Sequence, residues 1–354
     1  MASTKNIVPQ LKDVAREANV SLATASIILR NGKGRFHEDT KKRVFEVAKE
    51  LGWNQNLLVQ SIQTGKSRTV GVLVPPFDSY WADVLSGVHQ QLTEADYMPI
   101  TLWAGDTRKF ADEQQGLEHI KRLIGHRVEG LIVWPDFAET YKDTLVELNE
   151  TNNLPIVVID HCLEGCKADS VQTDEEQGSK LVADHLLELG HTNIACFSEF
   201  QKSARSWQLM RTKYFEFALF KSNQDVQFKL WQLSDDNNSD GFEVATKMLS
   251  GENRPTAVFA ETDHLAIDVY NAAKKLGIDI PTELSVVGFS GLDFTGKMQP
   301  ALTTVMQKGR EVGKYASKML VQRMTSEEAD SAHTVKVGSE LVVRESTAAV
   351  RRLS

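Results

Sequence analysis

The sequence lacks the features that would place the protein outside the cell or across a membrane. Its 354 residues include three cysteines, Cys162, Cys166 and Cys196, which are too few for a disulfide framework. No apolar run approaches the roughly 18 residues that a membrane-spanning helix needs. The first ten residues contain no apolar segment of a secretory signal. We therefore expect a cytoplasmic protein with two or three domains.

Motifs for catalysis and for bound cofactors are also scarce. The sequence has no G-x-G-x-x-G motif and no P-loop. Gly288–Leu292 approaches a G-x-S-x-G nucleophile elbow, but Leu292 stands where the second glycine should be. His161, Cys162 and Cys166 could indicate a metal, yet a fourth ligand is lacking. We therefore predict that the protein is not an enzyme and that it needs neither a metal nor a cofactor.

The charge of the chain is divided unevenly between a short basic head and a long acidic body. Residues 1–68 contain 12 Lys and Arg against 6 Asp and Glu, whereas the whole chain has a formal net charge of −8, so the remaining 286 residues carry −14. A basic head on an acidic body indicates that the head meets a polyanion such as nucleic acid. A lysine-rich surface helix would give the same asymmetry, so the charge alone leaves both interpretations open.

Three short helical patterns follow one another in the basic head. They span residues 11–18, 22–29 and 44–51, each with apolar residues at the i, i+3, i+4 spacing of a helix that packs on one side. Asn19 suits a left-handed turn, and Ser21 suits the N-cap of the second helix. Two short helices joined by a tight turn and braced by a third form a helix-turn-helix, although other small helical bundles share this pattern. Together with the basic charge, the spacing favours DNA binding.

From Thr69 onward, short apolar runs alternate with amphipathic helices, which is typical of doubly wound parallel sheets in an α/β fold. The expected strands lie at residues 70–74, 100–103, 130–134, 155–159, 194–197, 228–233, 257–260 and 285–289, with helices such as 81–95, 178–189 and 264–276 between them, and with a helix over 309–324 and a strand over 335–343 in the tail. The pattern predicts two similar lobes, with a ligand at the carboxyl ends of their strands.

Several motifs make the chain similar to a known family. Residues 11–26 read LKDVAREANVSLATAS, and TKKRV (40–44), ELGW (50–53) and TGKSRTVGV (64–72) follow. In order and spacing, these motifs resemble the lactose/galactose repressor (LacI/GalR) family. The resemblance implies a helix-turn-helix domain, a hinge helix and a periplasmic-binding-protein-like body in a transcriptional regulator, most commonly a repressor.

The resemblance gives the chain three parts. The helix-turn-helix DNA-binding domain takes residues 1–53, the hinge helix and linker residues 54–68, and the effector-binding and dimerisation domain residues 69–354. Within the last part, we assign about 69–163 and 305–325 to the N-terminal lobe, and about 164–304 and 326–345 to the C-terminal lobe.

The resemblance also implies which residues of the second helix meet DNA. The matching positions are Leu22, Ala23 and Ile27 facing the bases, with Thr24, Ser26, Arg30, Arg35, Lys41, Lys42 and Arg43 near phosphates. Polar side chains usually occupy the base-facing positions in this family. Leu, Ala and Ile can only contact thymine methyls or exclude poorly shaped sequences. Ile27 could instead be buried, but Ala25, Ile28 and Leu29 already fill the inner stripe.

Residues 56–63 connect the head to the body and place Leu58 and Ile62 on one helical face. A helix of about eight residues does not persist alone in water. In the family, this segment folds when two copies meet in the DNA minor groove. Leu58 matches a position that packs against the dimer mate, and Ile62 matches one that wedges between base pairs. Gln55 replaces the family's proline before the helix, and a plain flexible linker is the alternative.

The effector site is expected where polar and aromatic residues follow the strands. The candidates are Tyr80, Trp81, Asp160, Arg205, Trp207, Arg211, Asp263 and Ser290. Arg205 matches an effector-binding arginine of the family, and with Arg211 it would suit a carboxylate or phosphate, whereas Asp and Trp suit sugar hydroxyls and a ring face. Arg211 could equally brace the lobe, and Asp263 could cap a helix. The run from Gly288 to Asp293 resembles the gluconate-repressor branch, which adds sugar acids to sugars as candidates.

The sequence therefore predicts a sequence-specific regulator that binds pseudo-palindromic operator DNA as a homodimer, under the control of a small sugar or sugar acid bound between two lobes. A carbohydrate-binding protein or enzyme of the same fold, without operator recognition, is the alternative. Whether the effector releases or recruits DNA, and whether dimers form tetramers, stays open.

Overall fold

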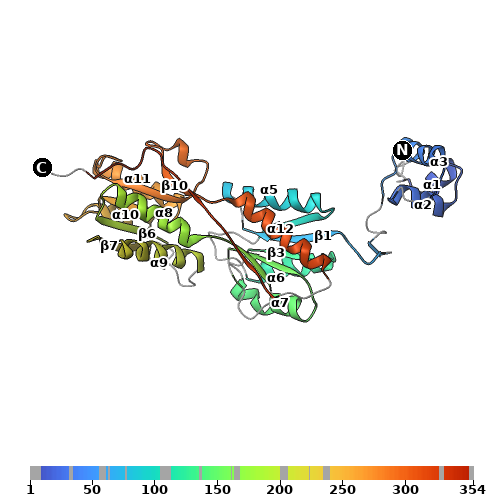
Figure 1. The fold of residues 1–354 in the computed structure, drawn as a ribbon, viewed down its shortest axis with the longest axis horizontal. Coiled ribbons are helices and arrows are strands. Elements are labelled where there is room, and N and C mark those ends of the chain that lie inside the picture. The colour runs from blue at the N-terminus through green and yellow to red at the C-terminus, as the bar shows by residue number, and fades with distance from the viewer. Residues whose placement is uncertain are drawn as a thin grey trace, which may run out of the picture. The chain divides into compact units, whose positions relative to one another are not determined.

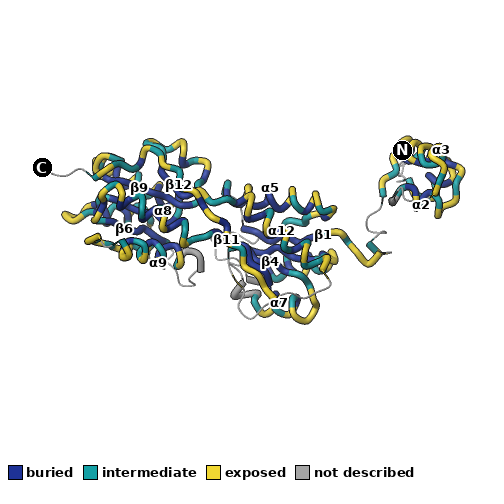
Figure 2. The backbone as a smooth tube through the Cα atoms, in the orientation of Figure 1, coloured by how far each residue is buried: buried dark blue, intermediate teal, exposed yellow. Residues whose placement is uncertain are grey.

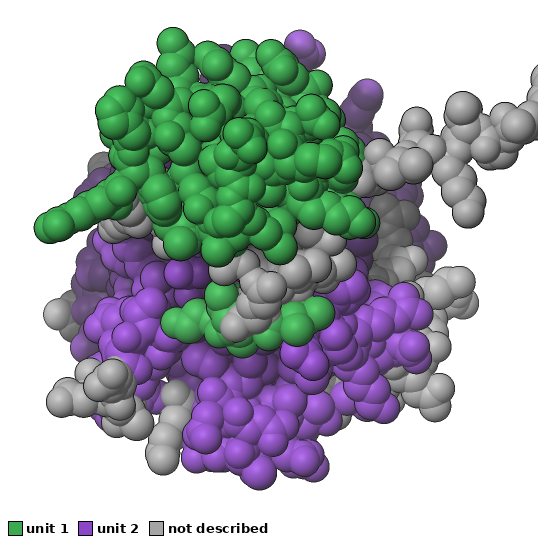
Figure 3. All heavy atoms as spheres, turned by 90° about the vertical axis from the view of Figure 1, so that its right-hand side faces the viewer, with its two compact units in different colours: residues 1–67 green, residues 68–354 purple. Residues whose placement is uncertain are grey.

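The computed structural model describes residues 9–31, 35–55, 61–62, 64–75, 78–103, 113–134, 138–160, 162, 168–199, 206–222, 224–233, 240–326 and 331–350 (Figure 1). The chain forms two compact units, residues 1–67 and 68–354, which Figure 3 colours separately. The division falls one residue before the end of the linker expected from the sequence.

The first unit is a bundle of three short helices, α1 (Leu11–Glu17), α2 (Leu22–Asn31) and α3 (Glu38–Glu50). Its apolar core draws on all three helices and includes the buried residues Val14, Ala18, Ile28, Val44 and Ala48. Between α1 and α2, Asn19 adopts a left-handed conformation with φ 51°, and the Ser21 hydroxyl accepts a hydrogen bond from the Thr24 amide at 3.0 Å. The helices and the turn therefore form as the sequence predicts.

The first lobe of the second unit is a parallel sheet in the order β11-β5-β4-β3-β1-β2. Its strands are β1 (Thr69–Val74), β2 (Met98–Trp103), β3 (Leu131–Val133), β4 (Ile156–Ile159), β5 (Asp169–Thr173) and β11 (Thr334–Val337). Its helices are α5 (Ser79–Glu94), α6 (Glu113–Gly125), α7 (Ala138–Glu150) and α12 (Gly309–Thr325). In Figure 1, α5 and α12 cover one face of this sheet, and α6 and α7 cover the other.

The second lobe repeats this plan in the order β12-β10-β9-β8-β6-β7, with β12 antiparallel to β10. Its strands are β6 (Asn193–Ser198), β7 (Gln227–Gln232), β8 (Ala257–Ala260), β9 (Ser285–Ser290), β10 (Thr303–Met306) and β12 (Glu340–Val342). Its helices are α8 (Glu175–Glu188), α9 (Ser206–Lys221), α10 (Gly241–Leu249), α11 (Asp263–Leu276) and the short η2 (Thr295–Lys297).

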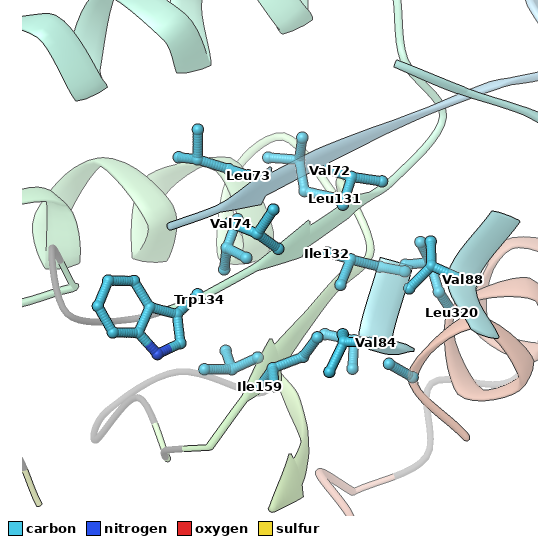
Figure 4. Packing of buried hydrophobic residues seen from close by; sticks show 14 of the residues in the cluster. Val72, Leu73, Val74, Val84, Val88, Leu131, Ile132, Trp134, Ile159 and Leu320 are labelled. Carbon is cyan, nitrogen blue, oxygen red and sulfur yellow. The ribbon is translucent and has the colours of Figure 1, made fainter. Parts of the chain in front are cut away.

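The residues of the central strands are buried, as Figure 2 shows. Along β8, Ala257 and Phe259 join the apolar cluster on the side of α8 and α9, whereas Val258 and Ala260 join the cluster on the side of α10 and α11. In the first lobe, side chains of β1, β3 and β4 pack against α5 and α12, including Val84 and Leu320 (Figure 4). Strands covered on both faces explain the continuous apolar runs in the sequence.

The structure corrects the predicted division of the lobes in two places. Residues 169–173 form β5 of the first sheet, although the sequence assigned them to the second lobe. The single tail strand expected over 335–343 is two strands, because β11 pairs with β5 in the first sheet and β12 pairs with β10 in the second. The polar residues of β5 gave no apolar run to detect.

The chain crosses between the lobes three times, and hydrogen bonds join the crossings. Gln307 Nε2 donates to Thr173 Oγ1 at 2.9 Å. The Gln177 side chain donates to the Ser339 carbonyl at 3.0 Å and accepts from the Ser339 amide at 2.8 Å. A short set of neighbouring connections of this kind is the usual form of a hinge between two lobes.

Candidate functional site

The outer face of α2 presents apolar side chains to solvent. Leu22 is 54% exposed and Ile27 is 45% exposed, whereas Ala25 and Ile28 are fully buried. The interpretation that Ile27 is a buried helix residue is therefore wrong. Ala23 is also exposed, Thr24 and Ser26 are half-buried, and the side chain of Arg30 lies outside the described residues.

The basic residues of the head differ in what they contact. Arg43 Nε donates to the Ala18 carbonyl at the end of α1, at 3.0 Å. Lys41 forms an ion pair with Glu38 at 2.7 Å, and its side chain is 21% exposed. Arg35 and Lys42 are exposed. Arg43 was expected near a DNA phosphate, and this hydrogen bond shows that it also links α3 to the end of α1.

The hinge is described only in part. Leu58 lies outside the described residues, and Ile62 is 75% exposed. The Gly65 amide donates to the Ser61 carbonyl at 2.8 Å, which is the bond of one helical turn. An exposed aliphatic side chain in a connecting segment is suited to burial against another surface.

In both sheets, the order in which the chain adds strands changes direction at the first strand of the lobe. In the first, β1 lies between β2 and β3, and in the second, β6 lies between β7 and β8. Ligands of doubly wound sheets bind outside the carboxyl ends of the strands at such switch points. The residues that follow β1, β3, β6 and β8 are therefore the first candidates for an effector site.

Aromatic side chains occupy the switch point of the first sheet. The rings of Tyr80 and Trp81 meet edge to face with centroids 5.2 Å apart, and those of Trp81 and Trp134 with centroids 5.6 Å apart. Asp78 holds them in place, because its carboxylate caps α5 by accepting from the Trp81 amide at 3.1 Å. Trp134 directly follows β3 and lies at the edge of the apolar cluster in Figure 4. Tyr80 and Trp81 were candidates from the sequence, whereas Trp134 was not.

Asp160 follows β4 in a left-handed conformation with φ 62°. Its carboxylate accepts from the Tyr80 hydroxyl at 3.1 Å and from the Thr173 amide at 3.3 Å. Burial, followed by the neighbouring Glu175 carboxylate, raises the pKa of Asp160 to about 7. Burial and Asp160 also raise the pKa of Tyr80. The two candidates thus form one polar pair at the carboxyl edge of the first sheet, with Tyr80 buried and Asp160 half-buried.

Arg211 is the main brace of the second lobe. Its guanidinium donates to both carboxylate oxygens of Glu175, at 2.8 and 2.9 Å, and to the Glu261 carbonyl at 2.6 Å. Its Cζ lies 3.6 Å from the centre of the Phe289 ring. Only 2% of its side chain is exposed. Of the two roles left open by the sequence, this geometry favours the brace over a contact to an anionic effector.

Asp263 is fully buried, and both oxygens of its carboxylate accept hydrogen bonds from protein groups. It accepts from the Thr304 hydroxyl at 2.6 Å and from the Leu292 amide at 2.8 Å, and burial raises its pKa. It does not cap α11, because Thr262 is the N-cap and accepts from the Leu265 amide. Asp263 therefore fixes the loop that follows β9, after Ser290.

Ser290 has a φ of 125° and is half-buried. Such a conformation is rare for a residue other than glycine and is found preferentially at functional sites. Arg205 lies outside the described residues, and so does the side chain of Trp207. The effector-binding roles of these three residues stay predictions.

The residue that directly follows β8 is a second site residue that sequence reasoning missed. Glu261 is fully buried, and its Oε1 accepts from the Thr212 hydroxyl at 2.8 Å. Burial raises its pKa to about 8. A charged residue that ends the run Ala-Val-Phe-Ala was the available signal, because the end of a central parallel strand is where ligands bind.

The comparisons with known proteins agree with this architecture. The family model "Bacterial regulatory proteins, lacI family" matches residues 10–56, and "Periplasmic binding protein-like domain" matches residues 183–347. The HTH-type transcriptional repressor PurR of Vibrio vulnificus (strain CMCP6) is 31% identical over 340 residues, which cover 95% of this chain and 97% of that protein. The chain belongs to the LacI family of bacterial regulatory proteins.

Two solved structures extend the likeness. A LacI family transcriptional regulator from Enterococcus faecium, with bound ribose, is 26% identical with a TM-score of 0.67, and the match covers 80% of this chain and 100% of that one. The lac repressor dimer bound to operator and the anti-inducer ONPF has a TM-score of 0.80 at 21% identity, over 97% of this chain and 100% of that one. At that identity, the second match shows the fold alone.

This LacI-family protein is thus a DNA-binding transcriptional regulator with a helix-turn-helix head and a periplasmic-binding-protein-like body. The family, the α/β fold class and the regulatory function predicted from the sequence are confirmed. The prediction that it is not an enzyme is confirmed as well, because PurR proteins among its relatives are HTH-type transcriptional repressors. In the part of the chain that is described, no helix is both long and apolar enough to cross a membrane.

Proposed function

We propose that this LacI-family regulator is a repressor that binds a pseudo-palindromic operator as a homodimer and responds to a sugar-like effector held between its two lobes. It would act in the cytoplasm, where the operator DNA lies. The lac repressor structure is a dimer on operator, which supports the same assembly here, since a two-fold dimer matches a two-fold DNA site.

The observation that carries the proposal is the juxtaposition of polar and aromatic groups where the carboxyl edges of the two sheets meet. Tyr80 and Asp160 form the polar pair of the first lobe, and Glu175 and Arg211 form that of the second. The two pairs are close enough for Glu175 and Arg211 to influence the pKa of Asp160. A carboxylate beside aromatic rings is the combination that suits sugar hydroxyls and a sugar ring face.

The effector would act by changing how the lobes close. The three crossings between the lobes, joined at Thr173, Gln307 and Ser339, form a hinge on which small rotations are inexpensive. Closure would alter the spacing of the two hinge segments of a dimer and so their ability to fold in the minor groove. An effector shifts this equilibrium only by its differential affinity for the two closures, typically about 1–3 kcal/mol.

The test uses operator DNA selected from a random pool and labelled for fluorescence anisotropy. We expect the affinity to fall steeply with salt, because phosphate contacts release counterions. A sugar or sugar acid should change the affinity by about 5- to 150-fold at constant salt. Operator binding that no sugar and no sugar acid alters would contradict the proposed effector.

The proposed role of Arg205 has its own test. Arg205→Ala should abolish the thermal stabilisation that the effector confers, while operator affinity without effector stays unchanged. Stabilisation retained in the variant would remove Arg205 from the effector site.

A further inference from the structure

Among the described residues at the switch points, Glu261 carries the one buried side-chain oxygen without a hydrogen-bond partner. Its Oε1 accepts from Thr212, but its Oε2 has no hydrogen-bond partner among the residues that the structure describes. Asp263, two residues later, is different, because both of its carboxylate oxygens accept protein donors. Of the two acidic residues after β8, Glu261 is therefore the one that can still accept a hydrogen bond.

The position of this oxygen is fixed by the strand that precedes it. Side chains alternate along β8, and Ala257 and Phe259 face α8 and α9. By this alternation, the side chain of Glu261 lies on the same side of the strand as Phe259. Its carbonyl accepts from Arg211 and its carboxyl from Thr212, both in α9. It thus lies between α9 and the carboxyl end of β8, which borders β6 at the switch point of the second sheet. Sheet topology and the unused oxygen independently indicate the same place for a ligand.

A buried acceptor without a partner is costly. Leaving one unsatisfied destabilises a protein by about 1–3 kcal/mol, and more if the group is charged. Native structures retain few such groups, and those they retain often serve a function. Burial raises the pKa of Glu261 to about 8, so the free carboxyl is largely protonated at neutral pH. A hydroxyl or amino group of a bound ligand would supply the missing donor and favour the ionised form, which accepts through Oε2.

The charges around Glu261 restrict which ligand can do so. The described residues at the meeting of the two sheets include one guanidinium, that of Arg211, and five carboxyl groups, those of Asp160, Glu175, Glu199, Glu261 and Asp263. That guanidinium already forms a bidentate pair with Glu175. This site already disfavours negative charge, because desolvation raises the pKa values of Asp160 and Glu261. A charged acid group on the ligand would face the same cost, with the one guanidinium already paired.

We propose that Glu261 selects the effector class, its Oε2 accepting a hydrogen bond from a hydroxyl or amino group of a sugar that has no acid group. The inference rests on the proposed function and narrows it, since sugars and sugar acids were both left as candidates. Thr212 positions the carboxyl through Oε1, and Arg211 fixes the main chain beneath it. Both contacts hold Glu261 in place while using neither lone pair of Oε2.

The first experiment compares sugars and their acids on the full-length wild-type chain by thermal shift and titration calorimetry. The probes are D-ribose, D-glucose and D-galactose, D-glucosamine, and D-gluconate and D-glucuronate. We expect stabilisation by a neutral or amino sugar and at least tenfold weaker binding of its acid counterpart. Tighter binding of an acid would overturn the role of Glu261 but leave the proposed sugar-type effector in place. No binding of any probe or of a wider sugar panel would refute both.

The second experiment uses Glu261→Gln with Glu188→Gln as its matched control. Binding is measured at pH 9, above the pKa of about 8 that burial gives Glu261. There glutamine keeps the acceptor for Thr212 but replaces the ionised Oε2 with an amide donor, so the effector should bind about 10- to 100-fold more weakly. Glu188 is exposed at the last residue of α8, whereas Glu175, at the first residue, lies near the site. Glu188→Gln removes one carboxylate as well, and we expect it to leave effector binding unchanged. Unchanged effector affinity in Glu261→Gln, with unfolding temperature and operator affinity retained, would overturn the proposal. The comparison of sugars with their acids uses the wild-type chain, so it still tests the proposal if Glu261→Gln fails to fold.

Discussion

The apolar face of α2 makes a prediction about how the operator is read. Leu22 is 54% exposed and Ile27 is 45% exposed. Full burial of such a side chain contributes about 1.5–3 kcal/mol, so covering the exposed half against a base should contribute about 1 kcal/mol for each. Thymine offers a methyl group in the major groove, whereas guanine and adenine offer polar edges that these side chains cannot pair with. We therefore expect thymines opposite Leu22 and Ile27.

The assay measures anisotropy with an operator half-site in which single thymines are replaced by uracil, which removes only the methyl group. Each contacted position should lose about fivefold in affinity, and Leu22→Ala or Ile27→Ala should lose a similar factor without altering the salt dependence. Phe45→Ala is the control, since Phe45 is 50% exposed but lies on α3. Equal affinity for the thymine and uracil duplexes at every position would refute the reasoning.

Three further predictions concern the hinge, the first lobe and pH. Ile62→Ala should weaken specific binding and reduce the DNA bend, and unchanged bending in a phasing assay would remove Ile62 as a wedge. Gly313→Ala should lower the unfolding temperature by several degrees, because a methyl there meets the α5 backbone. Gly251→Ala, which has open space around it, should not. The pKa values of Asp160 and Glu261 are raised to about 7 and about 8, so the stability they contribute is present below about pH 4 and lost as the pH rises through these values. Calorimetry of the free protein should thus show a lower unfolding temperature at pH 9 than at pH 6. The difference between the two temperatures should be smaller in Asp160→Asn, which lacks one of the two titrating groups.

The elements with apolar periodicity could be predicted from the sequence, and those with polar sequences could not. The inner stripe of α2 was predicted correctly because a helix buries one face whatever its partner is. Strand β5 was missed because the buried carboxylate of Asp169 is compensated by distant groups, a bidentate pair with Arg323, 154 residues away, and the amide of His333, 164 residues away. No local pattern indicates that such a residue lies in a central strand.

The candidate site shows the same limit. Tyr80 and Asp160 could each be proposed from their position after a strand, but the bond between them spans 80 residues. The sequence also could not say whether Arg211 would bind an effector or a protein carboxylate. That depended on Glu175, which lies at the start of α8 and was not a candidate. Local sequence thus indicates where side chains gather, while their pairing follows from the tertiary fold.

Hydrogen exchange of residues 54–68 tests the coupling between effector and operator most directly. The full-length protein would be measured alone, with operator, with effector, and with both. We expect strong protection of these amides only when operator is bound, and a change in that protection when the effector is added. Equal protection in all four states would contradict an effector-controlled hinge.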